Sequence, residues 1–162
     1  MITLFQILLY LFLLLFFHEL GHVISAKILG LKIKKVSFLL KPYPHFFVAV
    51  SWPNNNKEKF IYLFSGVFFT FTLFFISFYN NFFNSKALYI AFLIQIIIES
   101  NPFYSDYTIA ILSNDKKIKY GKNYGVNYNE QFSKYQFSNK WYFHFFMWAF
   151  LIILLINLNI FS

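Results

Sequence analysis

His18-Glu19-Leu20-Gly21-His22 brings two imidazoles and a carboxylate into the most apolar stretch of this chain. No Asp, Glu, Lys or Arg precedes it, from Met1 to Phe17. On a helix, residues four positions apart lie on one face, so both imidazoles can reach one metal ion. A carboxylate beside them can serve as a general base, which is the chemistry of the His-Glu-x-x-His zinc motif. Because a carboxylate is costly in hydrocarbon, the stretch predicts a functional metal site inside a membrane helix.

The composition of the 162 residues is that of a membrane protein. Hydrophobic residues make up 59% of the chain and charged residues only 12%, about half the charged share of a soluble domain. The chain has no cysteine, so a metal site has to use histidines and carboxylates. All 14 basic residues are lysines that gather outside the apolar stretches. This distribution favours the lipid bilayer as a partner and argues against nucleic acid.

The apolar stretches predict an all-α polytopic membrane protein with a single domain over residues 1–162. We expect about four transmembrane helices, since each span needs ~20 apolar residues. Alternating residues on both sides of a Pro-rich turn predict a short β-hairpin between the first and second helices. Gly30 is the expected end of the first helix, which we interpret as a retained span because it lacks the basic start of a signal peptide. The expected helices are 2–29, 60–79, 87–112 and 141–160, the hairpin is 31–52, and a Lys-rich loop is 114–140.

The third span changes character between residues 99 and 106. Pro102 removes a backbone donor and should break the helix, and irregular backbone inside a membrane is tolerated where it lines a cavity. Two of the six acidic residues, Glu99 and Asp106, flank this break. Asp106 is expected at the depth of His18 and is our first choice for a third metal ligand. Glu99 lies roughly two turns away and is the second choice.

The lysines also predict an orientation in the membrane. The positive-inside rule places the two Lys-rich connectors, 31–59 and 114–140, in the cytoplasm and both termini outside. Abundant Phe, Ile, Lys and Asn are typical of an AT-rich bacterial genome, which indicates a multi-pass protein of a bacterial cell membrane. His45 in the hairpin turn and His144 at the start of the last span are interpreted as incidental and interfacial residues, respectively.

Taken in order, these features resemble the site-2 protease family of intramembrane zinc metalloproteases. The likeness begins with the His18–His22 motif in a membrane helix and the hairpin after it. Ser65-Gly66 is similar to that family's Gly-Pro-x-x-Asn element. Asn101-Pro102-Phe103-Tyr104-Ser105-Asp106 is similar to its Asn-Pro…Asp-Gly element. The resemblance covers roughly residues 1–112.

The resemblance implies a zinc ion held by His18, His22 and Asp106. Glu19 would activate the water that attacks a peptide bond, and Asn101 would position the substrate backbone or stabilise the oxyanion. The hairpin would pair with an unwound substrate segment as an added strand. The implied substrate is a membrane-spanning or membrane-associated peptide.

Three departures from the family pattern keep other readings open. Tyr107 stands where the family has Gly, Val67 replaces its Pro, and Thr70 replaces its Asn. An alternative is therefore a catalytically degenerate relative that binds a peptide or acts as an immunity or protection factor. A third reading is a different class of membrane metalloprotease that takes Glu99 as its third ligand. Metal transport is less favoured, because the chain offers one compact site and no string of ligands.

Overall fold

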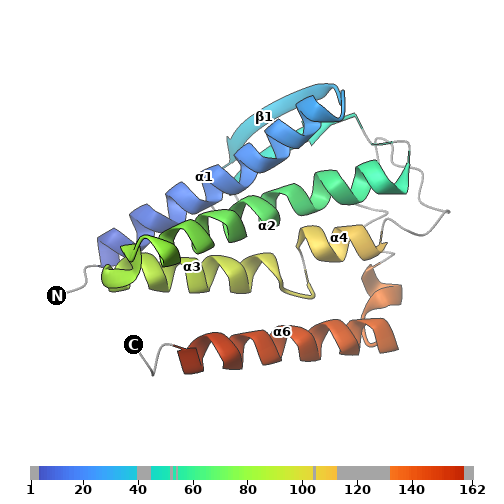
Figure 1. The fold of residues 1–162 in the computed structure, drawn as a ribbon. Coiled ribbons are helices and arrows are strands. Elements are labelled where there is room, and N and C mark those ends of the chain that lie inside the picture. Colours follow the sequence, from blue (N-terminus) through green and yellow to red (C-terminus); the bar gives the residue numbers. More distant parts are fainter. Residues whose placement is uncertain are drawn as a thin grey trace. The chain divides into compact units, whose positions relative to one another are not determined.

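The computed structural model describes residues 4–39, 45–51, 53, 55–103, 105–112 and 132–158. The chain is mostly helical and carries one short, two-stranded antiparallel sheet (Figure 1). It divides into two compact units, residues 1–96 and residues 97–162. The first part of the predicted Lys-rich loop, up to residue 131, lies outside the described residues.

Helix α1 (Leu4–Ile28) carries the His-Glu-x-x-His motif and ends where the sequence predicts. Gly30 adopts a φ of +66°, a left-handed conformation that glycine reaches without a steric cost. The Leu31 N–H donates to the Ala26 carbonyl at 2.8 Å, and the Gly30 N–H donates to the Lys27 carbonyl at 3.2 Å. This pair of hydrogen bonds is a Schellman motif, which satisfies carbonyls at the end of the helix.

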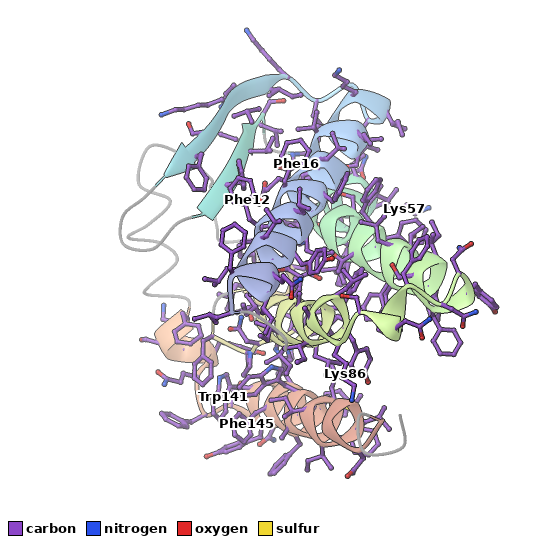
Figure 2. The ribbon with its side chains drawn as sticks, turned by 90° about the vertical axis from the view of Figure 1, so that its left-hand side faces the viewer. Phe12, Phe16, Lys57, Lys86, Trp141 and Phe145 are labelled. Carbon is purple, nitrogen blue, oxygen red and sulfur yellow. The ribbon has the colours of Figure 1, made fainter. Side chains whose placement is uncertain are left out.

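The predicted hairpin is formed by β1 (Ile33–Leu39) and β2 (His45–Val50), which pair antiparallel. Both strands contact α1. Phe12 and Phe16, one helical turn apart on α1, are labelled in Figure 2. Their rings pack against that of Phe46 on β2 with centroid distances of 5.3 and 5.9 Å. Phe38 of β1 joins this aromatic cluster at 4.7 Å from Phe46. The cluster fixes the hairpin on the helix that carries the motif.

Helix α2 (Asn56–Tyr79) begins at an N-cap, where the Asn55 side chain accepts a hydrogen bond of 2.8 Å from the Glu58 N–H. It packs along α1 in the first unit. A 3-10 turn, η1 (Phe82–Asn84), leads from α2 to α3 (Lys86–Glu99). Leu14, Ala91 and Phe92 form the buried core of this unit.

Within the described residues, two helices are long and apolar enough to cross a membrane, α1 and α2. Their large apolar side chains include many that are exposed, among them Phe5 at 72% and Phe68 at 73%. An apolar face of this kind suits lipid better than water. The structure thus supports membrane association, the coarser half of the sequence prediction of about four spans.

The expected third span is divided in two, as Pro102 predicts. Helix α3 ends at Glu99, and α4 (Asp106–Leu112) begins a new helix after the break. In the second unit, a helical turn over residues 132–135 precedes α6 (Asn139–Leu158), close to the predicted fourth span. Leu112, Tyr135 and Trp141 form the buried core of this unit, and Trp141 stacks on Phe145 (Figure 2).

Candidate metal centre

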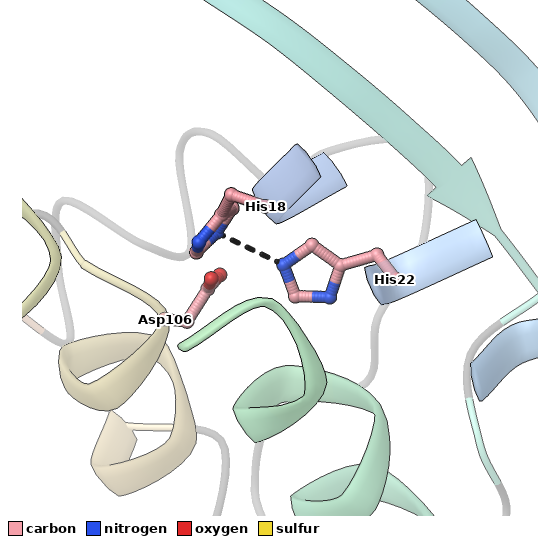
Figure 3. A group of neighbouring side chains, drawn as sticks. All are labelled: His18, His22 and Asp106. Carbon is pink, nitrogen blue, oxygen red and sulfur yellow. Dashed lines mark hydrogen bonds between the residues drawn. The ribbon is translucent and has the colours of Figure 1, made fainter. Parts of the chain in front are cut away.

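His18 and His22 lie one turn apart on α1 and turn their imidazoles toward each other (Figure 3). Both side chains are buried, and their Nε2 atoms are 3.2 Å apart. Two nitrogens that each bind one tetrahedral zinc ion at 2.0–2.1 Å lie about 3.3 Å from each other. The spacing of the two Nε2 atoms therefore fits a shared zinc ion.

The tautomer of His22 is set by helix α2. Its Nδ1 lies 2.8 Å from the backbone carbonyl oxygen of Tyr62. A carbonyl oxygen can only accept, so Nδ1 carries the proton and donates. In a neutral imidazole this leaves the lone pair on Nε2, which is the nitrogen that faces His18. An outer hydrogen bond of this kind orients a histidine for metal binding.

Two serines complete the surroundings of His22. The Ser65 hydroxyl donates to the Tyr62 carbonyl at 2.6 Å and lies 3.2 Å from His22 Nδ1. The Ser25 hydroxyl donates to the His22 carbonyl at 3.0 Å and lies 2.8 Å from the Ser65 hydroxyl. This network ties α1 to α2 at the level of the motif and holds the His22 ring in place.

Glycines allow the two helices to approach this closely. A Cβ at Gly66 would lie 2.6 Å from both Cε1 and Nε2 of His18 and 2.7 Å from Nε2 of His22. A Cβ at Gly21 would lie 2.7 Å from the Ser65 carbonyl oxygen. The two glycines thus let α1 and α2 approach closely, and the space that Gly66 leaves lies against the imidazoles.

Asp106 is the first residue of α4 and is half-buried. It lies in the second unit, whereas His18 and His22 lie in the first. Its role as the third ligand beside the two imidazoles stays a prediction. Two imidazole nitrogens and a carboxylate form a donor set that suits zinc.

The other carboxylates of the predicted spans are placed differently. Glu19 follows His18 on α1 and is half-buried. Glu99, the second choice as a ligand, is buried at the end of α3. The choice between Asp106 and Glu99 as the third ligand stays a prediction.

Asn101 shapes the break between α3 and α4. Its side-chain oxygen accepts from the Phe103 N–H at 2.9 Å, and its side-chain NH₂ donates to the Ile98 carbonyl. Its own carbonyl accepts from the hydroxyls of Ser105 at 2.7 Å and Thr108 at 3.1 Å. These bonds satisfy backbone groups that the break would otherwise leave open. The role in catalysis that the resemblance implies for Asn101 stays a prediction.

His144 is more than the interfacial residue that the sequence indicates. It is buried, and its Nε2 lies 3.0 Å from the Ser100 carbonyl, to which it must donate. Nδ1 lies 3.0 Å from the Tyr135 hydroxyl and accepts from it in the neutral ring. Tyr107 packs its ring against the imidazole with a centroid distance of 4.5 Å. His144 thus joins α6 to the break in the third span and gives Tyr107 an aromatic partner.

Tyr62 is the residue of this site that sequence reasoning missed. Its carbonyl orients His22, and its side chain is buried against the His22 ring at a centroid distance of 5.1 Å. A backbone carbonyl leaves no trace in the sequence. The available signal was a tyrosine hydroxyl within an otherwise apolar span, where a buried hydroxyl needs a partner.

No family model matches the chain, and neither does any curated protein or solved structure with which it was compared. The assignment of a function therefore depends on the chemistry of the residues themselves.

Proposed function

We propose that this protein is a membrane-embedded zinc endopeptidase that hydrolyses a peptide bond in a membrane-spanning or membrane-associated peptide. The observation that carries the proposal is the pair of buried imidazoles of His18 and His22, whose Nε2 atoms lie 3.2 Å apart, the spacing of two ligands of one zinc ion. A general base adjoins one of the ligands, because Glu19 follows His18 in the chain. This is the combination that metal-assisted peptide hydrolysis requires.

The donor set fits zinc by its chemistry and by the spacing of its nitrogens. His18 and His22 would bind through Nε2, and Asp106 would supply a carboxylate oxygen. Three protein ligands leave a fourth position for water or substrate, as in catalytic zinc sites. When bound, the ion would polarise the scissile carbonyl group and make water a better nucleophile.

The remaining steps belong to side chains of the chain itself. The Glu19 carboxylate would accept a proton from the attacking water and deliver it to the leaving amine. The Tyr62 carbonyl and the Ser65 hydroxyl would hold His22 in its ligating tautomer. The bonds of Asn101 within the break would hold the backbone that leads to Asp106. Under the resemblance, Asn101 would also position the substrate backbone.

The hairpin is the proposed binding element for the substrate. A transmembrane helix has its backbone hydrogen bonds satisfied internally, so a bond within it becomes accessible only after local unwinding. An unwound segment can recover backbone hydrogen bonds by adding to the edge of a strand. The side chains of Lys34, Lys35 and Val36 on β1 are exposed, whereas β2 has the more extensive contact with α1. These features favour β1 as the edge to which substrate adds.

We also propose that the chain crosses a bacterial cell membrane about four times. The spans would be α1, α2, the broken pair α3 and α4, and α6. The Lys-rich connectors would lie in the cytoplasm and both termini outside, as the positive-inside rule requires. The ligands would then lie on the cytoplasmic side of the membrane midpoint.

A second candidate function is a degenerate relative that binds a peptide without cutting it, for example as an immunity factor. The departures at Val67, Thr70 and Tyr107 favour it. The Thr70 hydroxyl lies 3.3 Å from the Gly66 carbonyl, to which it donates within its own helix, and Tyr107 packs on His144. These contacts give two of the departures structural roles.

The test combines metal content with cleavage in one set of purified proteins. Wild-type protein in detergent should contain one zinc ion per chain and should cut members of a fluorogenic library of single-span peptides. Glu19→Gln should keep the zinc and lose cleavage, because amide nitrogen cannot accept the proton. Glu58→Gln, the same exchange in the first turn of α2, controls for charge and purity. Cleavage by Glu19→Gln at the wild-type rate would refute the proposal. If His18→Ala still protected cells against a peptide, that result would favour the immunity factor.

A further inference from the structure

Tyr62 makes contacts on two sides, and each side concerns a different part of the proposed enzyme. Its backbone carbonyl accepts the hydrogen bond from Nδ1 of His22 at 2.8 Å. Its hydroxyl donates to the carbonyl of Val48 at 3.0 Å. Val48 lies in the middle of β2, where it pairs with Val36 of β1. One buried residue of α2 therefore links a metal ligand to the hairpin.

The two contacts are rigid in different ways. The carbonyl belongs to the backbone of α2, so its direction is set by the helix. The Tyr62 ring lies against the His22 imidazole with an interplanar angle of 47°. Its hydroxyl, at the far end of the ring, reaches the carbonyl of Val48 on β2. A tyrosine side chain has few rotamers, and burial leaves that of Tyr62 little freedom to reorient. The distance from Val48 to His22 is thus spanned by a single packed side chain.

We infer that Tyr62 is a positioning residue that sets the substrate-binding hairpin at a fixed place relative to His22. This inference rests on the proposed function and adds to it how the strand and the ligand stay in register. A substrate strand that adds to the hairpin can be cut at a defined bond only if the hairpin keeps its distance from the metal centre. The Phe12, Phe16 and Phe46 cluster holds the hairpin by apolar contact, whereas the Tyr62 hydroxyl supplies a directional bond.

Tyr62→Phe separates the two sides, because it removes the hydroxyl and leaves the ring and the carbonyl. We expect zinc affinity to stay within about twofold of wild type. The KM for a cleaved library peptide should rise about two- to tenfold, the size expected for the loss of one buried hydrogen bond, with kcat little changed. Amide hydrogen exchange over residues 45–50 should become faster. Tyr79→Phe, the same change at an 80% exposed position of α2, should alter none of these quantities.

Each outcome has a defined meaning. Unchanged KM and unchanged exchange in Tyr62→Phe would overturn the inference while leaving the proposed protease intact. A fall in zinc affinity as large as the rise in KM would also overturn it, because the hydroxyl would then act on the ligand. If wild-type protein neither binds zinc nor cuts peptides, the proposed function fails. In that case the exchange rates of residues 45–50 still test the link between Tyr62 and the hairpin.

Discussion

Gly66 on α2 lies so close to His18 on α1 that a Cβ at position 66 would be 2.6 Å from the imidazole Nε2. The second helix therefore does more than cover the motif. Gly66 leaves room for the imidazoles because it has no side chain. The Tyr62 carbonyl accepts a hydrogen bond from His22, and the Ser65 hydroxyl lies beside the same ring nitrogen. The helix that packs on the His-Glu-x-x-His motif thus sets the geometry of the proposed metal centre.

Gly66→Ala should disrupt the metal centre more than the fold. The added methyl group would have to displace the His18 and His22 rings, since real Cβ atoms do not approach other atoms to 2.6 Å. We expect a loss of zinc affinity of about 10- to 100-fold, the range seen when groups that orient ligands are changed. Competition with a fluorescent zinc chelator measures the affinity. Thr72→Ala, at an exposed position of the same helix, is the control; equal zinc affinity in both variants would contradict the prediction.

Asp106→Ala and Glu99→Ala should differ in metal content. Asp106 is the proposed third ligand, and Glu99 is the alternative that the sequence leaves open. Removing a ligand should lower zinc affinity by more than about tenfold, whereas removing Glu99 should leave the stoichiometry at one ion per chain. Elemental analysis after dialysis against a weak chelator distinguishes the two. Loss of zinc from Glu99→Ala alone would instead support the metalloprotease class that uses a glutamate ligand.

His144→Leu should lower the stability of the second unit. The leucine cannot accept from Tyr135 or donate to the Ser100 carbonyl, so both buried groups lose a partner. Each unsatisfied group costs about 1–3 kcal/mol. Thermal unfolding in detergent should show a lower midpoint for His144→Leu. In the His144→Leu background, Tyr135→Phe should recover part of the loss, because it removes the orphaned hydroxyl. Strict additivity of the two changes would argue against the coupling.

In an alkaline titration, the Tyr135 hydroxyl should lose its proton at a higher pH than an ordinary tyrosine. Burial raises the pKa of Tyr135 to about 12, and the neighbouring Tyr107 adds to the rise. Because this folded-state pKa lies above the ordinary value of about 10, the unfolded chain loses the proton first. The stabilising contribution is complete below pH ~10 and is lost as the pH rises through about 12. The phenolate absorbance of Tyr135→Phe should lack this last step, and that of Tyr142→Phe should retain it.

The proposed topology can be tested with single cysteines, since the natural chain has none. Asn84→Cys, in the turn between α2 and α3, should react with a membrane-impermeant maleimide on intact cells. Lys57→Cys, at the start of α2, should react only after the membrane is permeabilised. Both positions are exposed, so a difference in labelling reports the side of the membrane. Labelling of Lys57→Cys on intact cells would reverse the orientation that the positive-inside rule predicts.

The sequence alone determined the helical frame and the spacing of the two imidazoles. Gly30 permits the positive φ that follows α1, and Pro102 lacks the backbone donor that would continue a helix, so both breaks are set by local residues. The four-residue spacing of His18 and His22 placed their imidazoles on one face by helical geometry. Alternating residues on either side of a proline turn likewise sufficed for the hairpin.

Only the tertiary structure showed how the two imidazoles are held. The close approach of α2 to them at Gly66 depends on how two separate helices pack, which no local pattern specifies. The role of Tyr62 arises from a backbone carbonyl, a group that every residue has and that acquires meaning only through packing. The sequence indicated an interfacial role for His144, whereas the structure buries it between two hydrogen-bond partners. These partners are 9 and 44 residues away in the chain, so the sequence around His144 does not reveal them. Local patterns of residues can be read from the sequence, whereas contacts between distant segments depend on the fold.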